Sequence, residues 1–337
     1  MLALVVELVP KPKIIVVALG GTIASSNKDG KAGVKPSISG EDLVNNIPAI
    51  GTIADTVVLS LLLKPSADLT FSDLEYASKK IIDELEGGAD GIVVTQGTDT
   101  LEETAYFLNL VIQSNKPVVV TGAMRNPSSV SPDGDLNLLQ SVAVACDHKS
   151  VGLGTLVVMN GEIHLSSFVQ KTHTQNVATF KSPTLGPIGW VSEGKVRVIL
   201  KPISERMYWP VRNGTEPIIP IVKSVTGDNA VILSSLSPEK IDGLIIEATG
   251  GGHVSAQVAK LAIKYCKTIP VILCSRTGSG EVLTHTYSFE GSEMHLIENG
   301  VIPSGYLSSV KARVLLYQLL KNGLNIEKIR ATFGDLS

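Results

Sequence analysis

The sequence predicts an α/β protein with a large N-terminal domain, built on a mainly parallel, doubly wound sheet, and a smaller C-terminal α/β domain. Apolar runs of strand length alternate with segments of helical periodicity, which is typical of βαβ units. This alternation stops between Pro202 and Gly227, a stretch that contains four prolines, and then restarts. We therefore expect a first domain at 1–205, a linker at 206–226 and a second domain at 227–337.

In the first domain, each strand is predicted from a short apolar run bounded by turn residues. The central strand contains Ile92, Val93 and Val94, three adjacent β-branched residues that suit burial on both faces. Further strands are expected at 14–19, 56–63, 118–120, 155–159, 162–165 and 169–172.

The helices of this domain are predicted from apolar repeats at helical spacing and from capping residues. Thr100 with Glu103, and Ser72 with Glu75, each match the capping box that opens a helix. Two more helices are expected at 41–46 and 133–146, and a long polar loop at 25–40.

The second domain repeats the pattern on a smaller scale. Strands are expected at 230–233, 243–247 and 271–274, and helices at 254–266 and 308–322. The glycine run 250–252 lacks both the lysine of a phosphate-binding loop and the glycine spacing of a dinucleotide site. Nucleotide binding is therefore not expected.

Composition excludes several classes of function. Hydrophobic residues make up 44% of the 337 residues and charged residues 18%, which allows large cores and argues against disorder. The net charge is −3 without a basic block, so the chain is not suited to neutralising nucleic-acid phosphates. No apolar run reaches the roughly 20 residues that cross a bilayer. We expect neither a nucleic-acid nor a membrane partner.

The cysteines and the first ten residues favour a cytoplasmic location. Cys146, Cys266 and Cys274 are scattered, lie in apolar contexts and lack metal-ligand spacing. We interpret them as buried, reduced thiols, which are typical of a cytoplasmic protein. Residues 1–10 lack a basic segment and are interrupted by Glu7, which favours an N-terminal strand or arm over a signal peptide.

The candidate site lies in the loops that follow three apolar strands. Thr22 follows two glycines after the first strand, Thr98 and Asp99 follow Gly97 after the central strand, and a third strand ends at Thr121. If these strands are parallel, their carboxyl ends share the edge where open α/β sheets bind ligands. A threonine there can act as a nucleophile if a base takes its proton and backbone N–H groups bind the oxyanion.

Other polar residues give weaker signals. Taken alone, Lys171 is best interpreted as a surface lysine, because a lysine acts as a base only when it is desolvated or its pKa is lowered. His173 is best interpreted as structural or exposed. No cluster has metal-ligand spacing, and no Gly-x-Ser-x-Gly elbow is present. These patterns indicate a two-domain α/β protein with a threonine-rich site, without specifying its reaction.

The chain resembles the bacterial-type L-asparaginase family over nearly its whole length. Leu19-Gly-Gly-Thr-Ile-Ala24 is similar to the family's first threonine motif and Thr95-Gln-Gly-Thr-Asp-Thr100 to its second. The segments 121–125, 171–181 and 311–316 add to the resemblance. It implies an amidohydrolase that converts L-asparagine and water to L-aspartate and ammonia, without a cofactor.

The resemblance also implies a role for individual residues. Thr22 would be the nucleophile that forms an acyl-enzyme. Thr98, Asp99 and Lys171 would form a hydrogen-bonded group beside it, and Asp99 would also hold the substrate amino group. Ser66 would bind the substrate α-carboxylate. Gly97 is expected to contribute to substrate binding, because a glycine in this loop lets a ligand approach closely.

The resemblance further implies a homodimer or homotetramer with sites between subunits. In that family each site combines an N-terminal domain with a C-terminal domain. Glu293 falls where the family places an acid that reaches a neighbouring subunit's site.

Three positions depart from the family's pattern. Residues 25–41 contain no tyrosine, although many members carry one in this loop to help activate the nucleophile. Ala67 stands where better-known members have a glutamine or glutamate that touches the substrate amino group. Position 251 or 252 is glycine where some members have asparagine. The chemistry is expected to be intact, with thinner anchoring of the substrate.

Two alternatives stay open. One is a related amidase, either a glutaminase-asparaginase or the ammonia-releasing subunit of a glutamyl-tRNA amidotransferase. The latter has an extra N-terminal domain, whereas here the first threonine motif lies near the start of the chain. The other is a non-catalytic amino-acid-binding protein on the same scaffold, suggested by the missing tyrosine and Ala67. Ammonia release distinguishes the enzymes from the binding protein.

Overall fold

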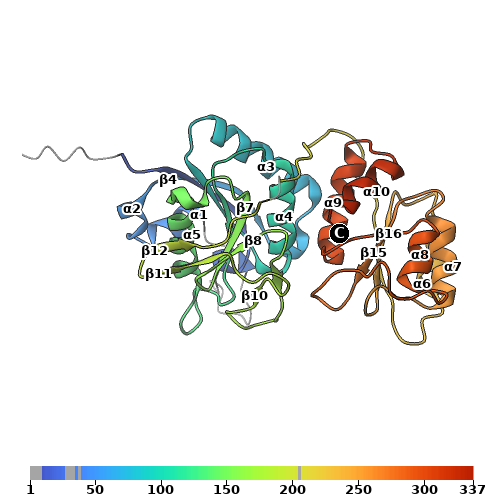
Figure 1. Cartoon of the computed structure of the whole chain (residues 1–337). Helices are drawn as coiled ribbons and strands as arrows, with labels where there is room; N and C mark the ends of the chain where they lie inside the picture. The colour runs from blue at the N-terminus through green and yellow to red at the C-terminus, as the bar shows by residue number, and fades with distance from the viewer. Residues whose placement is uncertain (1–9, 27–34, 37–38, 204–205, 337) are drawn as a thin grey trace, which may run out of the picture. The chain divides into compact units, whose positions relative to one another are not determined.

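The computed structural model of the chain describes residues 10–26, 35–36, 39–203 and 206–336 (Figure 1). They form two compact units. The first contains most residues up to Arg206, and the second contains Met207 onwards together with Tyr106–Ile112 and Pro183–Leu185. The predicted N-terminal strand lies outside the described residues, except for Pro10.

Eight strands of the described residues form the sheet of the first unit, in the order β12-β11-β8-β7-β6-β5-β1-β4. From β4 to β7 the neighbours are parallel, and β8, β11 and β12 extend the sheet through antiparallel pairs. The predicted mainly parallel sheet is confirmed. Its strands are β1 (Lys13–Gly20), β4 (Asp55–Lys64), β5 (Gly91–Thr95), β6 (Val118–Thr121), β7 (Thr155–Met159), β8 (Glu162–Leu165), β11 (Gly189–Ser192) and β12 (Lys195–Val198).

Helices and short strand pairs connect the strands of this sheet. The α-helices are α1 (Gly40–Asn45), α2 (Ile50–Ile53), α3 (Phe71–Glu86), α4 (Leu101–Val111) and α5 (Gly134–Cys146), of which α4 belongs to the second unit from Tyr106 onwards. Single 3₁₀ turns are η1 (Thr22–Ala24), η2 (Ser66–Asp68), η3 (Thr98–Thr100) and η4 (His148–Ser150). The short pairs are β2 (Ser25–Ser26) with β3 (Lys35–Pro36), and β9 (Gln170–Lys171) with β10 (Phe180–Lys181).

The central strands are buried because they are apolar on both faces. Ile14 and Val16 of β1 and Val93 of β5 belong to one core cluster with residues of α1, α2 and α5. Successive side chains of a strand point to opposite faces, so Ile15 and Val94 face the other side of the sheet. Figure 1 shows α3 on that side, opposite α5. Full burial of one such side chain contributes about 1.5–3 kcal/mol.

The carboxyl ends of β1, β5 and β6 lie side by side. Ala18 of β1 pairs with Thr95 of β5, and Thr95 pairs with Thr121 of β6. The chain reverses its direction of travel through the sheet at β1, because β4 adds on one side of it and β5 on the other. Ligands of open α/β sheets bind in the crevice that such a reversal creates. The loops predicted to carry the site therefore lie at one edge.

Glycines let these loops pack backbone against backbone. Gly21 has a φ of +88°, and a Cβ placed on it would lie 1.9 Å from the nitrogen of Gly97. A Cβ on Gly122 would lie 2.6 Å from the carbonyl oxygen of Gln96. No other residue fits at Gly21 without moving backbone atoms, so the loops after β1 and β5 are in direct contact.

The second unit has its own parallel sheet, in the order β13-β14-β15-β16. Its core joins Ile246 of β14 and Leu273 of β15 to Val258 and Ala262 of α7. The predicted smaller α/β domain is thus confirmed. The elements are β13 (Ile221–Lys223), β14 (Leu244–Ala248), β15 (Val271–Ser275), β16 (Ile302–Pro303), α6 (Val231–Ser235), α7 (Ala256–Tyr265), α8 (Glu293–Glu298), α9 (Ser309–Lys321) and α10 (Ile326–Gly334).

Within the described residues, no helix has both the length and the hydrophobicity needed to span a membrane. In the same residues, no group of three or more His, Cys, Asp or Glu side chains is placed to hold a metal ion.

The predicted strand at 230–233 is wrong, because Val231–Ser235 forms the short helix α6. Ala230 has a φ of +60°, and its N–H donates to Asp228 Oδ1 at 2.8 Å, which turns the chain into the helix. The apolar side chains that suggested a strand, Val231 and Ile232, are 61% and 62% exposed. A short apolar run does not distinguish a strand from one helical turn.

The helix predicted to open at Ser72 and Glu75 begins earlier, at Phe71. Its capping box is formed by Thr70 and Asp73 instead. Asp73 N–H donates to Thr70 Oγ1 at 3.2 Å, and Thr70 N–H donates to Asp73 Oδ2 at 2.9 Å. Both pairs have suitable residue types at suitable spacing, and the position of the first helical residue decides between them.

The segment 206–226, predicted as a linker, contains β13 near its end. Ile221 of β13 pairs with Ile245 of β14, which makes β13 the edge strand of the second sheet. The strand is only three residues long and directly follows Pro220, so it is too short to show a periodicity in the sequence.

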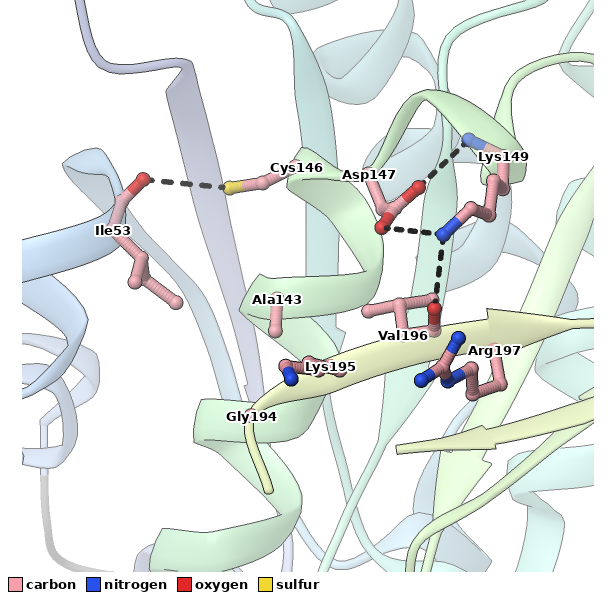
Figure 2. A pocket seen from close by; sticks show the side chains of 9 residues that line it. All are labelled: Ile53, Ala143, Cys146, Asp147, Lys149, Gly194, Lys195, Val196 and Arg197. Carbon is pink, nitrogen blue, oxygen red and sulfur yellow. Dashed lines mark hydrogen bonds and ion pairs between the residues drawn. The ribbon is translucent and has the colours of Figure 1, made fainter. Parts of the chain in front are cut away.

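The three cysteines are free, and Cys274 is fully buried. Cys146 and Cys266 are half-buried, which corrects the prediction that all three are buried. Burial raises the pKa of Cys146 to about 11 and that of Cys274 to about 12, so both stay protonated thiols near neutral pH. Cys146 lines a cavity of about 380 Å³, where its Sγ lies 3.9 Å from the carbonyl oxygen of Ile53 (Figure 2).

Replacing Gly21 with alanine is expected to destabilise the protein far more than replacing Gly88. Both glycines have positive φ, +88° and +98°, but a Cβ on Gly88 meets no atom within 4 Å. Gly88→Ala should cost about 1–2 kcal/mol of the free energy of unfolding for its left-handed backbone alone. Gly21→Ala adds a backbone clash of about 3 kcal/mol. Urea unfolding followed by circular dichroism measures both, and equal losses would show that the Gly21–Gly97 contact does not limit stability.

Candidate active site

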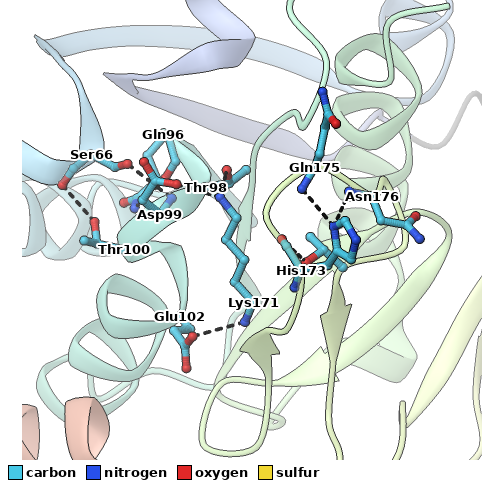
Figure 3. Close-up of polar contacts among 12 residues, drawn as sticks. Ser66, Gln96, Thr98, Asp99, Thr100, Glu102, Lys171, His173, Gln175 and Asn176 are labelled. Atoms are coloured by element: carbon cyan, nitrogen blue, oxygen red, sulfur yellow. Dashed lines mark hydrogen bonds and ion pairs between the residues drawn. The ribbon is translucent and has the colours of Figure 1, made fainter.

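Lys171, Thr98 and Asp99 meet at the carboxyl edge of the first sheet (Figure 3). Lys171 Nζ donates to Thr98 Oγ1 at 2.9 Å and to Asp99 Oδ1 at 2.6 Å. The side chain of Lys171 is 15% exposed and that of Asp99 is 68% exposed, so the pair is shielded on one side and open on the other. Lys171 is therefore not the surface lysine that its sequence context alone suggested. The contact brings an amine within proton-transfer distance of a threonine hydroxyl.

The backbone of Lys171 is held by a residue that the sequence did not single out. Among the strands of the described residues, β9, which ends at Lys171, pairs only with the two-residue strand β10. Lys171 N–H also donates to Glu102 Oε1 at 3.1 Å. Glu102 lies in the first turn of α4, directly after the turn that carries Thr98 and Asp99. The sequence signal that could have identified Glu102 is an acidic residue in the first turn of the helix that follows the candidate loop.

Ser66 supports the same turn from the neighbouring loop. It opens η2, with one residue between it and the end of β4, and is 3% exposed. Its Oγ accepts from Asp99 N–H at 3.2 Å, and its carbonyl oxygen accepts from Thr100 Oγ1 at 2.9 Å. A Cβ on Gly97 would lie 2.7 Å from Ser66 Oγ, so the approach of Ser66 requires a glycine there. Thr98 and Asp99, predicted as part of a loop, form the 3₁₀ turn η3 together with Thr100, the predicted N-cap.

Thr22 lies in the loop after β1, where it begins η1 and is half-buried. Because Gly21 packs against the backbone of Gly97, Thr22 and Thr98 each follow directly after the same contact between loops. The structure thus brings Thr98, Asp99 and Lys171 into contact and places Thr22 in the adjoining loop. The polar loop expected at 25–40 includes β2 and β3, and its residues 27–34 and 37–38 lie outside the described residues.

Glu293 belongs to the second unit, where it begins α8 and is fully buried. Its Oε1 accepts from the N–H groups of Thr286 at 3.0 Å and Tyr287 at 2.7 Å, and its Oε2 lies 3.0 Å from His253 Nε2. Burial raises the pKa of Glu293, but hydrogen bonds from the backbone and His253 together outweigh it and hold the pKa below its ordinary value. The His253 ring packs edge-on against Tyr287 and Phe289.

Two protein-family models together match most of the chain. The model described as "Asparaginase, N-terminal" matches residues 13–204. The model described as "Glutaminase/Asparaginase C-terminal domain" matches residues 219–333.

Individual proteins match over the full length. A probable L-asparaginase of Deinococcus radiodurans is 35% identical over 329 residues, which cover 96% of this chain and 97% of the relative. L-asparaginase 2 of Escherichia coli strain K12 is 33% identical over 337 residues, covering 96% and 93%. The crystal structure of a probable cytoplasmic L-asparaginase from Campylobacter jejuni matches with a TM-score of 0.88 at 31% identity, covering 96% and 99%. The chain therefore belongs to the asparaginase family.

Proposed function

We propose that the chain hydrolyses the side-chain amide of L-asparagine, releasing L-aspartate and ammonia through an acyl-enzyme on Thr22. The observation that carries the proposal is the contact of one lysine amine with both Thr98 Oγ1 and Asp99 Oδ1. This group lies beside the loop that carries Thr22, because Gly21 and Gly97 pack against each other. Relatives named as L-asparaginases over nearly the full length support the choice of substrate.

The proposed reaction has two steps. In the first, Thr22 Oγ attacks the amide carbon, the carbon–nitrogen bond breaks, and ammonia leaves with the hydroxyl proton of Thr22. In the second, water attacks the ester, one of its protons returns to Thr22 Oγ, and aspartate is released. Lys171 takes up and returns protons through Thr98, and Asp99 stabilises the ammonium form of the lysine. Backbone N–H groups of the loops bind the oxyanion that forms in each step.

The substrate is anchored by hydrogen-bonding atoms of Ser66 and Asp99 that remain available after the contacts within the loops are made. Ser66 Oγ already accepts from Asp99 N–H, so its own hydrogen stays available to donate to the α-carboxylate of the substrate. Asp99 Oδ1 contacts Lys171, and because the Asp99 side chain is 68% exposed, its Oδ2 can bind the substrate ammonium group. The missing side chain at Gly97 lets Ser66 Oγ lie against this backbone, which keeps the Ser66 hydroxyl beside Asp99. Amide hydrolysis by these groups needs no cofactor.

We further propose a homodimer or homotetramer with sites between subunits, as the family resemblance implies. That resemblance gives Glu293 contact with a neighbouring subunit's site. Because both carboxylate oxygens of Glu293 are buried and bonded, we assign it a positioning role there, acting through His253 and the backbone of residues 286–287. We also propose a cytoplasmic location, which the three free cysteines support.

Thr22→Ala and Thr98→Ala are each expected to lower kcat for ammonia release from L-asparagine by about a thousandfold or more, because each removes a hydroxyl that the chemistry uses. The measurement is ammonia release from L-asparagine and from L-glutamine. Thr52→Ala, at an exposed threonine of α2, is the matched control. Full activity in either site variant would remove that threonine from the mechanism. The glutamine rate decides between an asparaginase and a glutaminase-asparaginase.

Ser66→Ala is expected to raise KM for L-asparagine by about tenfold or more, because a hydrogen bond to a charged carboxylate is lost. Ser78→Ala is the control, since Ser78 is an equally buried serine whose hydroxyl donates to the Glu75 carbonyl within α3. Steady-state kinetics of both variants provide the comparison. An unchanged KM in Ser66→Ala would exclude Ser66 from carboxylate binding.

Glu293→Gln is expected to make the free energy of unfolding fall less steeply as the pH is lowered. The folded-state pKa of Glu293 lies below its ordinary value of 4.5, so its carboxylate stabilises the fold above that pH, and this contribution is lost as the pH falls through the folded-state pKa. Glutamine keeps the side chain's shape and one acceptor oxygen without titrating. Denaturant unfolding at stepwise lower pH tests this, with Glu298→Gln, at an exposed acid on the same helix, as control. If the free energy of unfolding falls equally steeply with decreasing pH in the unaltered protein, Glu293→Gln and Glu298→Gln, the expectation is contradicted.

A further inference from the structure

A second cavity in the first unit is lined by hydrogen-bond donors. It has a volume of about 610 Å³ and lies between the loop 124–130, which follows β6, and the turn 173–177, which follows β9. Its polar lining includes Arg125, Asn126, Ser129, His173, Gln175 and Asn176, and none of the described residues that line it is acidic. None of these residues has a role in the proposed hydrolysis.

Two asparagines in this cavity have their acceptor atoms already bonded. Asn126 Oδ1 accepts from Ser128 N–H at 2.9 Å, and Asn176 Oδ1 accepts from Ala178 N–H at 2.9 Å. Only the oxygen of an amide side chain can accept from a backbone N–H, so these bonds fix the orientation of both amides. The NH₂ groups, which can only donate, are left for a ligand.

In His173, too, the acceptor atom is bonded to backbone N–H groups. Its Nδ1 accepts from the N–H groups of both Gln175 and Asn176, each at 3.0 Å (Figure 3). A ring nitrogen that accepts hydrogen bonds carries no hydrogen, so the hydrogen of the neutral ring is on Nε2. The remaining nitrogen of His173 is therefore a donor as well.

Arg125 adds a positive charge that its own loop does not neutralise. One guanidinium nitrogen donates to the carbonyl oxygen of Ser131 at 3.1 Å, which is not a charged partner. The carboxylate of Asp133 is bonded to the same loop, but its oxygens accept from the backbone N–H groups of Met124 and Arg125 and from the amide of Asn137. The guanidinium thus keeps donors available beside the three neutral ones.

We propose that this cavity binds a small organic oxyanion, recognised by Arg125 together with the amides of Asn126 and Asn176 and the ring N–H of His173. A cationic, donor-lined cavity favours acceptor groups of negative charge, and guanidinium matches the geometry of carboxylate and phosphate. The volume lies in the range of small-molecule sites. The ligand carries either carboxylate or phosphate groups, and the site does not depend on the hydrolytic mechanism.

Isothermal titration calorimetry of the full-length protein tests the proposal with three probes at constant ionic strength. Citrate represents a polycarboxylate, inorganic phosphate represents the phosphate group, and glycerol is a neutral probe. We expect saturable binding of citrate or phosphate, with the tighter probe identifying the ligand class, and none of glycerol. Absence of binding for both anions up to millimolar concentration would overturn the proposal.

Variants locate the binding. Arg125→Gln is expected to weaken anion binding by about tenfold or more, because a charge-assisted contact is lost. Asn176→Asp keeps the Oδ1 bond to Ala178 N–H but replaces the donor by a second acceptor and a negative charge, and it should weaken binding at least as much. Arg197→Gln, at an exposed arginine of β12 outside this cavity, is the control and should leave binding unchanged.

Circular dichroism confirms that each variant is folded before titration, and Asn176→Asp gives the test on its own if Arg125→Gln does not fold. Anion binding that survives both substitutions but is lost in Ser66→Ala would place the anion in the candidate active site and overturn the proposal. Ammonia release from L-asparagine, measured on the same samples, keeps a failure of the proposed hydrolysis distinct from a failure of this inference.

Discussion

The backbone contact between Gly21 and Gly97 is the constraint on which the candidate site depends. It lies where the sheet reverses its strand order, between β1 and β5, and a Cβ on Gly21 would lie 1.9 Å from the Gly97 nitrogen. Since each threonine directly follows one of these glycines, the contact fixes the separation of Thr22 and Thr98 through the backbone. Two rigid parallel strands set the positions of both, which is more exact than two independent loops would be.

The positively charged residue of the candidate site, Lys171, comes from a different element, the strand β9. Lys171 lies on the two-residue strand β9, and its backbone N–H donates to Glu102 in the helix that follows Thr98 and Asp99. The lysine and its two partners are thereby attached to one rigid helix. In the proposed mechanism, an amine already in contact with Thr98 lowers the entropic cost of reaching the reactive arrangement.

Sequence reasoning predicted the sheet, its parallel order and the loops of Thr22 and Thr98, because buried strands and glycine-rich ends leave local signals. It did not predict Lys171 from residue patterns, because the burial and partners of that lysine come from chain segments far apart in sequence. Only the family resemblance pointed to it. The strand wrongly placed at 230–233 failed for a related reason, since its apolar side chains are exposed in the fold. Glu102 escaped notice because its role depends on the position of β9.

The candidate site and the donor-lined cavity follow one physical rule. In tight loops, backbone N–H groups without a partner in a helix or sheet take up the acceptors of nearby side chains, which avoids unsatisfied donors. At Ser66 this leaves a hydroxyl hydrogen, and at Asn126 and Asn176 it leaves NH₂ groups. Such loops then present mainly hydrogen-bond donors to a ligand. Their preference for anions therefore arises from the way the backbone uses the side-chain acceptors, as much as from any positive charge. On this argument the two sites share a chemistry of recognition. The candidate active site adds a lysine amine, Lys171, in contact with a threonine hydroxyl and a carboxylate, and this contact is the basis of the proposed proton transfer.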